Sequence, residues 1–390
     1  MDDTNLLDEQ DAGSTFRLRA GACLLFVAIL SWWFWSSGCD VIQTTPDIPA
    51  GTPRTQSFGM WVWNDDVISS VLEHNRLFDF CDEHGIDRLA IYIHLRHLGS
   101  GEFEVLHQTQ LKRFMKEAKS RGIVVEALDS GQSAGLAENH NMTLGRLESI
   151  LAFNDTLPDD HQFSGIHYDI EPYTLPEWHT DQRGKMMRDF MLLLRRAKAR
   201  LDEYEPRMTL ACDIPFFYDH TQHARDGYML PFDGSIKPFF KHIQDWTDYV
   251  VVMSYRRSAF GRNSIYTCIQ SEIIYAATIN KAVFSAVEMG EQPDHPKTSF
   301  FGTPVSSFWN QKQRLDDKLA THPAYGGMFV HDYTRFRQLI EAEAKEAEEA
   351  KEAKEAAEAE EAAEAEAEDD DNNQPEDESS VTSASSTDER

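Results

Sequence analysis

Asp169 and Glu171 stand two residues apart in the segment 163–171, which reads FSGIHYDIE. If this segment is a β-strand, its side chains alternate between two faces, so that His167, Asp169 and Glu171 share one face at a spacing of about 7 Å. The apolar residues between them share the other face. Two acids on a buried strand cost stability unless they are paired or solvated. The pattern indicates a site of acid–base chemistry, with a structural ion-pair network as the alternative.

Short apolar runs alternate with helical segments on both sides of this strand, and together they must position it. Seven further runs have the length and composition of strands, and the first two helical segments between them end at a glycine, Gly85 and Gly122. Eight strand–helix units predict an α/β protein with a parallel sheet closed as a (β/α)8 TIM barrel. An open doubly wound sheet is the alternative, although no Gly-rich phosphate loop follows the first strand. The predicted strands are 58–63, 88–93, 123–128, 163–171, 208–212, 249–255, 282–287 and 327–330, and the predicted helices are 67–84, 106–121, 144–153, 185–203, 236–245, 271–280, 311–319 and one that begins at Thr334.

Catalytic groups of such barrels lie where the strands end and the following loops begin. Acids, histidines and aromatic residues occur at these positions in this chain. Aromatic faces stack on the C–H faces of sugars, and carboxylates bind their hydroxyl groups, so the combination predicts a carbohydrate substrate. The candidate catalytic residues are Glu171, Asp169, Tyr255 and Glu288, and the candidate substrate-binding residues are Trp61, Trp63, His94, Asp129, His167, Asp213, Phe217, Met253, Trp309 and His331.

The fourth-strand segment resembles the signature of family 18 glycoside hydrolases, the chitinase-like barrels, in which acids two residues apart end in the catalytic Glu. The run Met253-Ser254-Tyr255 is similar to that family's sixth-strand Met-x-Tyr. The resemblance covers about residues 57–340 in strand order. It implies that Glu171 is the general acid, that Asp169 orients the substrate's own acetamide as internal nucleophile, and that Tyr255 helps to hold this group. This substrate-assisted route differs from the usual two-carboxylate scheme.

The chain also departs from the family pattern. Ser164 and His167 stand where the family usually has Asp or Asn, and Arg256 follows Tyr255 where an acid is common. Either Phe329 or His331 stands near the position of the eighth-strand Trp. The Asp169–Glu171 core is kept but the extended acid relay is not, so a catalytically inactive, glycan-binding barrel is one alternative function.

Glu288 supports a second enzymatic alternative. With Glu171-Pro172 it is similar to the acid and nucleophile of a large clan of two-carboxylate retaining glycosidases, which lie about 5 Å apart. An amidase or deacetylase would need a metal or a nucleophile that the sequence does not identify. His94, His331 and Asp332 lack the spacing of metal ligands. We therefore predict no metal and no cofactor.

An uncharged segment, residues 20–39, follows Arg17 and Arg19 near the N-terminus. Twenty uncharged residues can just span a bilayer, and arginines before them favour a cytoplasmic N-terminus. Two interpretations remain open: a signal anchor, or a lipoprotein signal cut before a lipidated Cys39, since residues 36–39 (SSGC) resemble a lipoprotein box. Both predict a membrane-tethered protein outside the cytoplasm. Residues 1–19 form a short polar tail, and residues 40–56 a linker.

Most of the formal net charge of −29 falls in residues 341–390, which are rich in Ala and Glu. This composition predicts a low-complexity tail that is helical at first and disordered later. The acidic balance of the remaining chain argues against nucleic acid as a partner, because phosphate binding needs a basic surface. Cys81, Cys212 and Cys268 have no metal-type spacing and are expected to be small core residues. The predicted catalytic domain spans residues 57–340.

Overall fold

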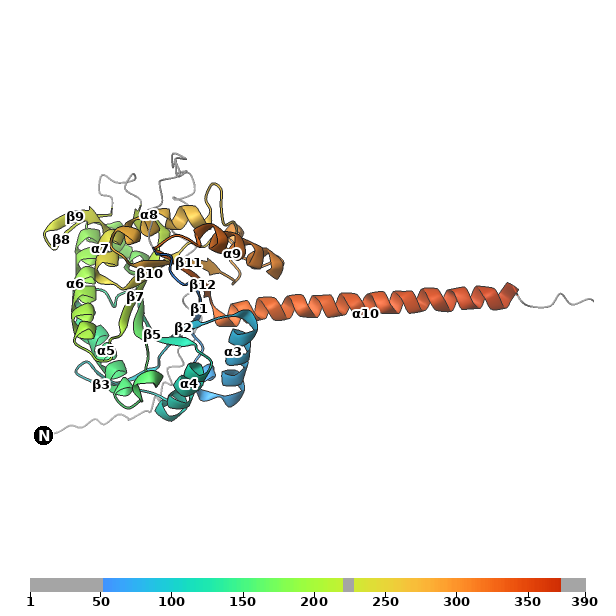
Figure 1. Ribbon diagram of the computed structural model, residues 1–390, viewed down its shortest axis with the longest axis horizontal. Helices are drawn as coiled ribbons and strands as arrows, with labels where there is room; N and C mark the ends of the chain where they lie inside the picture. Colours follow the sequence, from blue (N-terminus) through green and yellow to red (C-terminus); the bar gives the residue numbers. More distant parts are fainter. Residues whose placement is uncertain (1–51, 220–227, 373–390) are drawn as a thin grey trace, which may run out of the picture. The chain divides into compact units, whose positions relative to one another are not determined.

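The computed structural model describes residues 52–219 and 228–372. Eight parallel strands form a closed barrel, in which β1 and β2 are neighbours and the order continues through β5, β6, β7, β10, β11 and β12 back to β1 (Figure 1). All eight predicted strands are present, and the predicted α/β barrel is confirmed. The barrel strands are β1 (Ser57–Val62), β2 (Arg88–Tyr92), β5 (Val124–Ser130), β6 (Gly165–Asp169), β7 (Thr209–Pro215), β10 (Tyr249–Met253), β11 (Ala282–Glu288) and β12 (Tyr325–His331).

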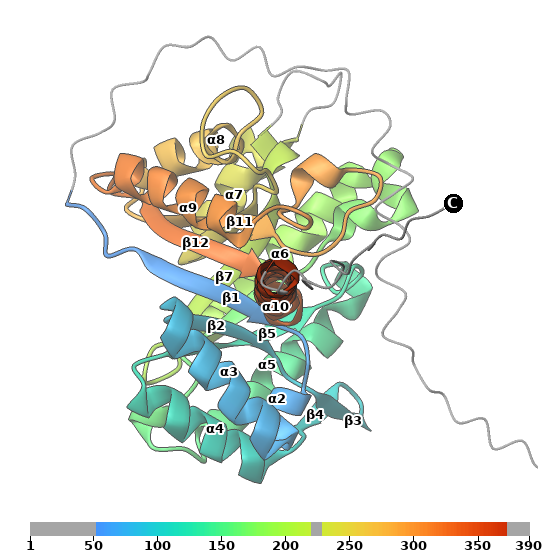
Figure 2. The same cartoon turned by 90° about the vertical axis from the view of Figure 1, so that its right-hand side faces the viewer.

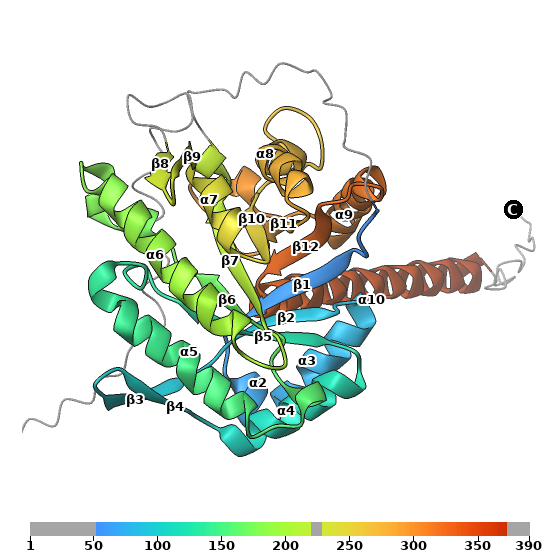
Figure 3. The same cartoon turned by 60° about the vertical axis from the view of Figure 1, so that its left-hand side comes forward.

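Helices cover the outside of the barrel, and Figure 3 shows α5 and α6 lying along it beside each other. Apolar side chains of both helices, such as Leu147 and Phe190, are buried. The helices of the barrel unit are α2 (Asp66–Ser69), α3 (Val71–His84), α4 (Gln108–Ser120), α5 (His140–Asn154), α6 (Arg183–Asp202), α7 (Phe239–Trp246), α8 (Ile265–Thr278) and α9 (Val305–Leu319).

Two differences from the predicted elements have local causes. The helix predicted over 67–84 is divided at Ser70, whose extended backbone ends α2 and whose hydroxyl accepts from the backbone N–H of Glu73 at the start of α3. Two antiparallel hairpins were not predicted. They are formed by β3 (Leu95–Gly99) with β4 (Glu102–Val105), and by β8 (Met229–Phe232) with β9 (Ser235–Pro238).

Large aromatic side chains fill the middle of the barrel, beneath the end at which its strands finish. Trp61, Tyr249, Phe284 and Phe329 belong to one buried cluster, to which Ala90, Ala211 and Ala286 contribute small side chains. Figure 2 shows β1 between β12 and β2, where the parallel register is continuous. These rings pack against the small side chains of the cluster, beneath the side chains at the strand ends.

Gly327 of β12 is required by both backbone conformation and space. Its φ is +122°, and a Cβ there would lie 1.9 Å from the carbonyl oxygen of Ser57 on β1. We expect Gly327→Ala to destabilise the protein by roughly 3 kcal/mol, because it combines backbone strain with a steric clash. Urea unfolding of the full chain, followed by circular dichroism, measures the change.

Gly184→Ala in α6 is the matched control, because a Cβ at that position meets nothing within 4 Å. It should leave stability unchanged or raise it by up to about 1 kcal/mol, since Ala is the better helix former. Equal stability of the two variants would contradict the close approach of β12 to β1.

The chain divides into two compact units, with the boundary between Phe336 and Arg337. Helix α10 (Tyr333–Asn372) starts in the first unit and continues through the described part of the second. There Lys345 pairs with Glu349 at 3.4 Å and Lys354 with Glu358 at 3.5 Å, as expected for a solvated helix.

The segment 20–39 and Cys39 lie outside the described residues, so the anchor, the lipidation and the extracytoplasmic location stay predictions. Within 52–219 and 228–372, the helices lack the combination of length and apolar composition needed to cross a bilayer. The domain bounds drawn from composition stay predictions as well.

Candidate functional site

Asp169 and Glu171 lie at the carboxyl end of β6, at the end of the barrel where its strands finish, which we call the mouth. Asp169 is the last residue of the strand, and the hydroxyl of Tyr173, in the turn that follows, donates a hydrogen bond to Glu171 Oε1. Burial, the charge of Glu171 and the charge of Asp213 raise the pKa of Asp169 well above its ordinary value. Burial and the charge of Asp213 also raise the pKa of Glu171, against the opposing effect of the Tyr173 hydrogen bond. Crowded carboxyl groups of this kind are poised for proton transfer.

Asp213 of β7 is the third carboxyl group of this cluster. Its Oδ1 lies 2.7 Å from Nε2 of His167, and its Oδ2 accepts the indole N–H of Trp61 at 2.9 Å. The carboxylate is buried, and its two oxygens are held by donors from the neighbouring strand β6 and from β1 across the barrel. It therefore keeps a fixed orientation beside the two acids of β6.

A polar network continues from His167 into the barrel interior. His167 Nδ1 lies 3.2 Å from Oε2 of Glu126 on β5, to which the Tyr249 hydroxyl of β10 also donates. Arg88 of β2 donates to the other Glu126 oxygen at 2.9 Å. Although burial raises it, Arg88 and His167 bring the pKa of Glu126 down to about 2.

Glu288 and His331 form a second pair on the opposite side of the mouth. His331 Nδ1 lies 2.8 Å from Glu288 Oε2, while the backbone N–H of Gly290 donates to Oε1 at 2.6 Å. The Trp63 indole donates to His331 Nε2 at 3.2 Å. Because an indole N–H can only donate, Nε2 must be the acceptor and the ring proton lies on Nδ1, facing Glu288. Although burial opposes it, His331 lowers the pKa of Glu288.

Tyr255 links the two sides of the mouth. Its ring stacks on that of His331 with centroids 6.2 Å apart. Burial raises the pKa of its phenol well above the ordinary value, and the charges of Glu288, Asp169 and Glu171 act in the same direction. The phenol is therefore a neutral hydrogen-bond donor at any physiological pH. The phenol is close enough to Asp169 and Glu171 on one side, and to Glu288 on the other, for their charges to act on it.

Several other residues predicted for the site lie at its edge or near it. Phe217 packs edge-on against Tyr173 at 5.2 Å, and Met253 is buried as the last residue of β10. His94 lies 3.6 Å from Asp65, and its ring packs on Tyr92 at the β1–β2 side of the barrel.

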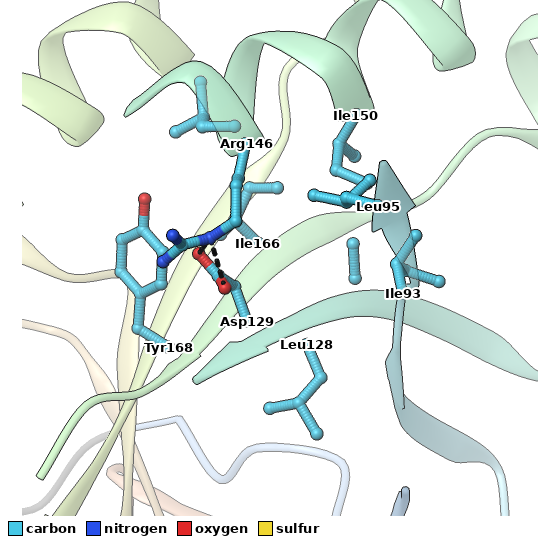
Figure 4. Close-up of a pocket in the computed structure, with 10 residues that line it drawn as sticks. Ile93, Leu95, Leu128, Asp129, Arg146, Ile150, Ile166 and Tyr168 are labelled. Carbon is cyan, nitrogen blue, oxygen red and sulfur yellow. Dashed lines mark hydrogen bonds and ion pairs between the residues drawn. The ribbon is translucent and has the colours of Figure 1, made fainter. Parts of the chain in front are cut away.

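Asp129 is turned away from the barrel interior. Leu128 belongs to the interior cluster, so alternation along β5 directs Asp129 outward. There both of its oxygens accept from Arg146 Nε of α5, at 2.8 and 3.0 Å (Figure 4). This ion pair belongs to a small pocket between the strands and α5, lined also by Ile166 and Tyr168. The structure thus does not bring Asp129 to the other candidates.

Trp309 is also separate from the cluster. It lies on α9 and packs against Phe58, near the start of β1, with ring centroids 5.7 Å apart. It also contacts Phe308 and Phe336. The amino ends of the strands lie opposite the mouth, so Trp309 belongs to the packing of helices against the barrel base.

Sequence reasoning missed Glu126, Arg88, Tyr249 and Tyr173. Glu126 interrupts an otherwise apolar predicted strand, which is the same signal that identified Asp169. Arg88 stands at the start of its strand and reads as a surface charge, so only the closed barrel places it opposite Glu126. In the described part of the chain, no group of three or more His, Cys, Asp or Glu side chains has a metal-binding arrangement.

Comparisons with known proteins give structural neighbours only. No protein-family model matches the sequence, and neither does any curated protein. A chitinase from Bacteroides thetaiotaomicron is 11% identical, with a TM-score of 0.45, over 72% of this chain and 91% of that chain. The spore cortex-lytic enzyme SleL of Bacillus cereus is 13% identical, with a TM-score of 0.45, over 75% of each chain.

A family 18 chitinase from Cycas revoluta, solved with (GlcNAc)3, is 13% identical, with a TM-score of 0.45, over 72% of this chain and 95% of that chain. The family that the fourth-strand segment resembles is thus represented among these structural neighbours, at low sequence identity.

Proposed function

We propose that this barrel is a glycoside hydrolase that cleaves N-acetylated glycans with the help of the substrate's own acetamide. The observation that carries the proposal is the pair of acids at the end of β6, Asp169 and Glu171, both with raised pKa and both near Tyr255. A carboxyl group that stays protonated near neutrality can donate a proton to a leaving oxygen.

In the first step, Glu171 gives its proton to the glycosidic oxygen while the acetamide carbonyl oxygen attacks the anomeric carbon. The C1–O bond to the leaving sugar breaks, and a cyclic oxazolinium forms within the substrate. Asp169 accepts the acetamide N–H and balances the developing positive charge, and the Tyr255 phenol donates to the acetamide oxygen. In the second step, the Glu171 carboxylate takes a proton from water, which opens the ring and restores the acid.

Hydrolysis assays with the full-length chain test this function. The panel pairs chromogenic glycosides with N-acetylglucosamine oligomers and with the corresponding de-N-acetylated oligomers. We expect turnover of the acetylated substrates only, and inhibition by a thiazoline analogue of the cyclic intermediate. Turnover of non-acetylated sugars without thiazoline inhibition would contradict the acetamide route. Binding of glycans without any turnover would identify a glycan-binding barrel instead.

Glu288→Gln separates the acetamide route from a two-carboxylate route. Both Glu288 oxygens already accept hydrogen bonds, from Gly290 and from His331, and the side chain orients His331 rather than facing the mouth freely. We expect kcat/KM to fall between about ten- and a hundredfold, the effect of one lost charge-assisted hydrogen bond. Steady-state kinetics on an N-acetylglucosamine oligomer measure it.

A loss above about ten-thousandfold in Glu288→Gln would instead be the effect of removing a nucleophile. The accompanying variant His331→Asn tests the same pair from its other member. Similar modest losses in both variants are expected if Glu288 acts by orienting His331.

A further inference from the structure

His167 is buried in the barrel interior, beneath the acids of the candidate site. It precedes Asp169 by two residues on β6 and points into the barrel, where it is completely inaccessible to solvent. Its Nδ1 faces Glu126 at 3.2 Å and its Nε2 faces Asp213 at 2.7 Å. A neutral imidazole can donate from only one of its nitrogens. With a carboxylate at each nitrogen, both must carry a proton, and His167 is an imidazolium.

Each carboxylate beside His167 has a cation that compensates its charge. Glu126 is also bound by Arg88 at 2.9 Å and by the Tyr249 hydroxyl, so its charge is already compensated on the side away from the site. The imidazolium is therefore left to compensate Asp213. Although burial opposes it, Asp213 and Glu126 raise the pKa of His167 to about 10.

Asp213 is held as an anion from two sides. Its Oδ1 faces the imidazolium and its Oδ2 accepts from Trp61 at 2.9 Å, so each oxygen has a donor. Burial raises the pKa of Asp213, while the charge of His167 and the hydrogen bonds from His167 and Trp61 act against this and favour the anion. The charge of Asp213 in turn raises the pKa of both Asp169 and Glu171.

We propose that His167 and Asp213 are a positioning pair that replaces the acid relay missing from this sequence. The buried imidazolium fixes Asp213 as an anion beside Asp169 and Glu171, and the negative charge of Asp213 keeps Glu171 protonated. The inference rests on the proposed function for its catalytic consequence, but the electrostatic effect of Asp213 on Glu171 exists with or without turnover. Neither residue touches the substrate in this scheme, since His167 is fully buried and Asp213 nearly so.

Other charged and titratable groups also face the acids and must stay unchanged in a test. Asp213 has neighbours on β1, β6, β10 and β12, and Glu171 has neighbours in the turn after β6 as well. These groups are His167, Asp169, Tyr173, Tyr218, Tyr249, Tyr255 and His331, with the Trp61 indole as a further donor.

Asp213→Asn in the full-length chain tests the pair, because it removes the charge and keeps the shape. The removal of a nearby negative charge lowers the pKa of Glu171. The descending limb of the kcat/KM profile should therefore move to lower pH, by about one unit. Asp248→Asn is the matched control. It removes a carboxylate just before β10, at the opposite end of the barrel, where Asp248 accepts from the backbone of Leu210, and it should leave the limb in place.

Carboxyl ¹³C NMR of the same proteins measures the Glu171 titration directly, with Glu171→Gln used to assign the signal. We expect the Glu171 midpoint to fall in Asp213→Asn and to stay fixed in Asp248→Asn. An unchanged midpoint in a folded Asp213→Asn protein overturns the pair. If the wild-type chain hydrolyses nothing, the proposed function fails, whereas the shift of the Glu171 midpoint still decides whether Asp213 acts on Glu171.

A second measurement decides the matter if Asp213→Asn does not fold. Imidazole ¹⁵N NMR of the wild-type chain, assigned through a His167 substitution, reports the protonation of both ring nitrogens. We expect His167 to keep both protons above pH 8. Titration of His167 near its ordinary value of 6.5 would mean that no fixed cation lies beneath the acids and would overturn the proposal.

Discussion

Glu171→Gln should reduce kcat on N-acetylglucosamine oligomers by about a thousandfold or more, while KM changes little. Gln has nearly the shape of Glu and can still accept the Tyr173 hydrogen bond, but it has no proton to give to the leaving oxygen. The loss should shrink when a good aryl leaving group replaces the sugar, because such a group departs with less protonation. Steady-state kinetics on both substrate types measure this difference.

Glu177→Gln is the matched control for this variant. Glu177 lies in the same connection after β6 but is exposed to solvent. Its replacement should leave both rates unchanged. If Glu171→Gln retained a tenth or more of the activity on oligomers, Glu171 would not be the general acid.

The pH dependence of the wild-type chain follows from the same residue. Burial and the charge of Asp213 raise the pKa of Glu171 above its ordinary 4.5. The active form is the protonated one, so activity is present below the folded-state pKa and is lost as pH rises through it. The descending limb should therefore lie above pH 4.5, and it should be missing from the residual activity of Glu171→Gln.

The fold was predictable because its signal is repeated along the chain. Each barrel strand is a short apolar run followed by a helix, and eight such units leave few alternatives to a closed barrel. The hairpins β3–β4 and β8–β9 were not predicted, because each lies between a barrel strand and the helix that follows it. The alternation of strands and helices predicts nothing about such connections. The division of the helix over 67–84 depends on a single capping serine, Ser70, within a continuous helical pattern.

The candidate site was predictable where chemistry and strand ends coincide. Asp169 and Glu171 lie at and just beyond the end of β6, and Asp213 lies two residues before the end of β7. The barrel gathers them because parallel strands end on one side. Asp129 also stands near a strand end, but its position in the two-residue alternation turns it outward to Arg146. A shift of one residue along the strand decides whether an acid points into the barrel or outward, and the position of a strand end alone does not give this information.

The buried network shows the limit of reading strands one at a time. Glu126, His167 and Asp213 come from three different strands, and their pairing depends on the order of those strands in the barrel. In the sequence, His167 is a candidate substrate-binding residue that stands where the family pattern usually has Asp or Asn. In the structure, carboxylates from β5 and β7 face it on both sides, so that acidic groups remain close to Asp169 although they are supplied by other strands.

Asp169→Asn should lower kcat by about a hundredfold, the effect expected for a group that stabilises charge in the transition state. The anion of Asp169 balances the positive charge that develops as the acetamide attacks, and Asn cannot supply it. Unlike the Glu171 variant, the loss should be the same for good and poor leaving groups, because Asp169 acts on the acetamide and not on the departing oxygen. Rates on aryl and oligomeric substrates, compared for the two variants, measure this contrast.

Asp181→Asn provides the control, since Asp181 is an exposed carboxylate in the connection between β6 and α6. It should not affect either rate. If the loss in Asp169→Asn shrank with good leaving groups in the same way as that in Glu171→Gln, Asp169 would be acting through the proton on Glu171. The acetamide would then need another partner, and its carbonyl oxygen would be held by Tyr255 without a counter-charge. Equal losses on both substrates therefore assign the two acids to separate events, one at the leaving oxygen and one at the attacking amide.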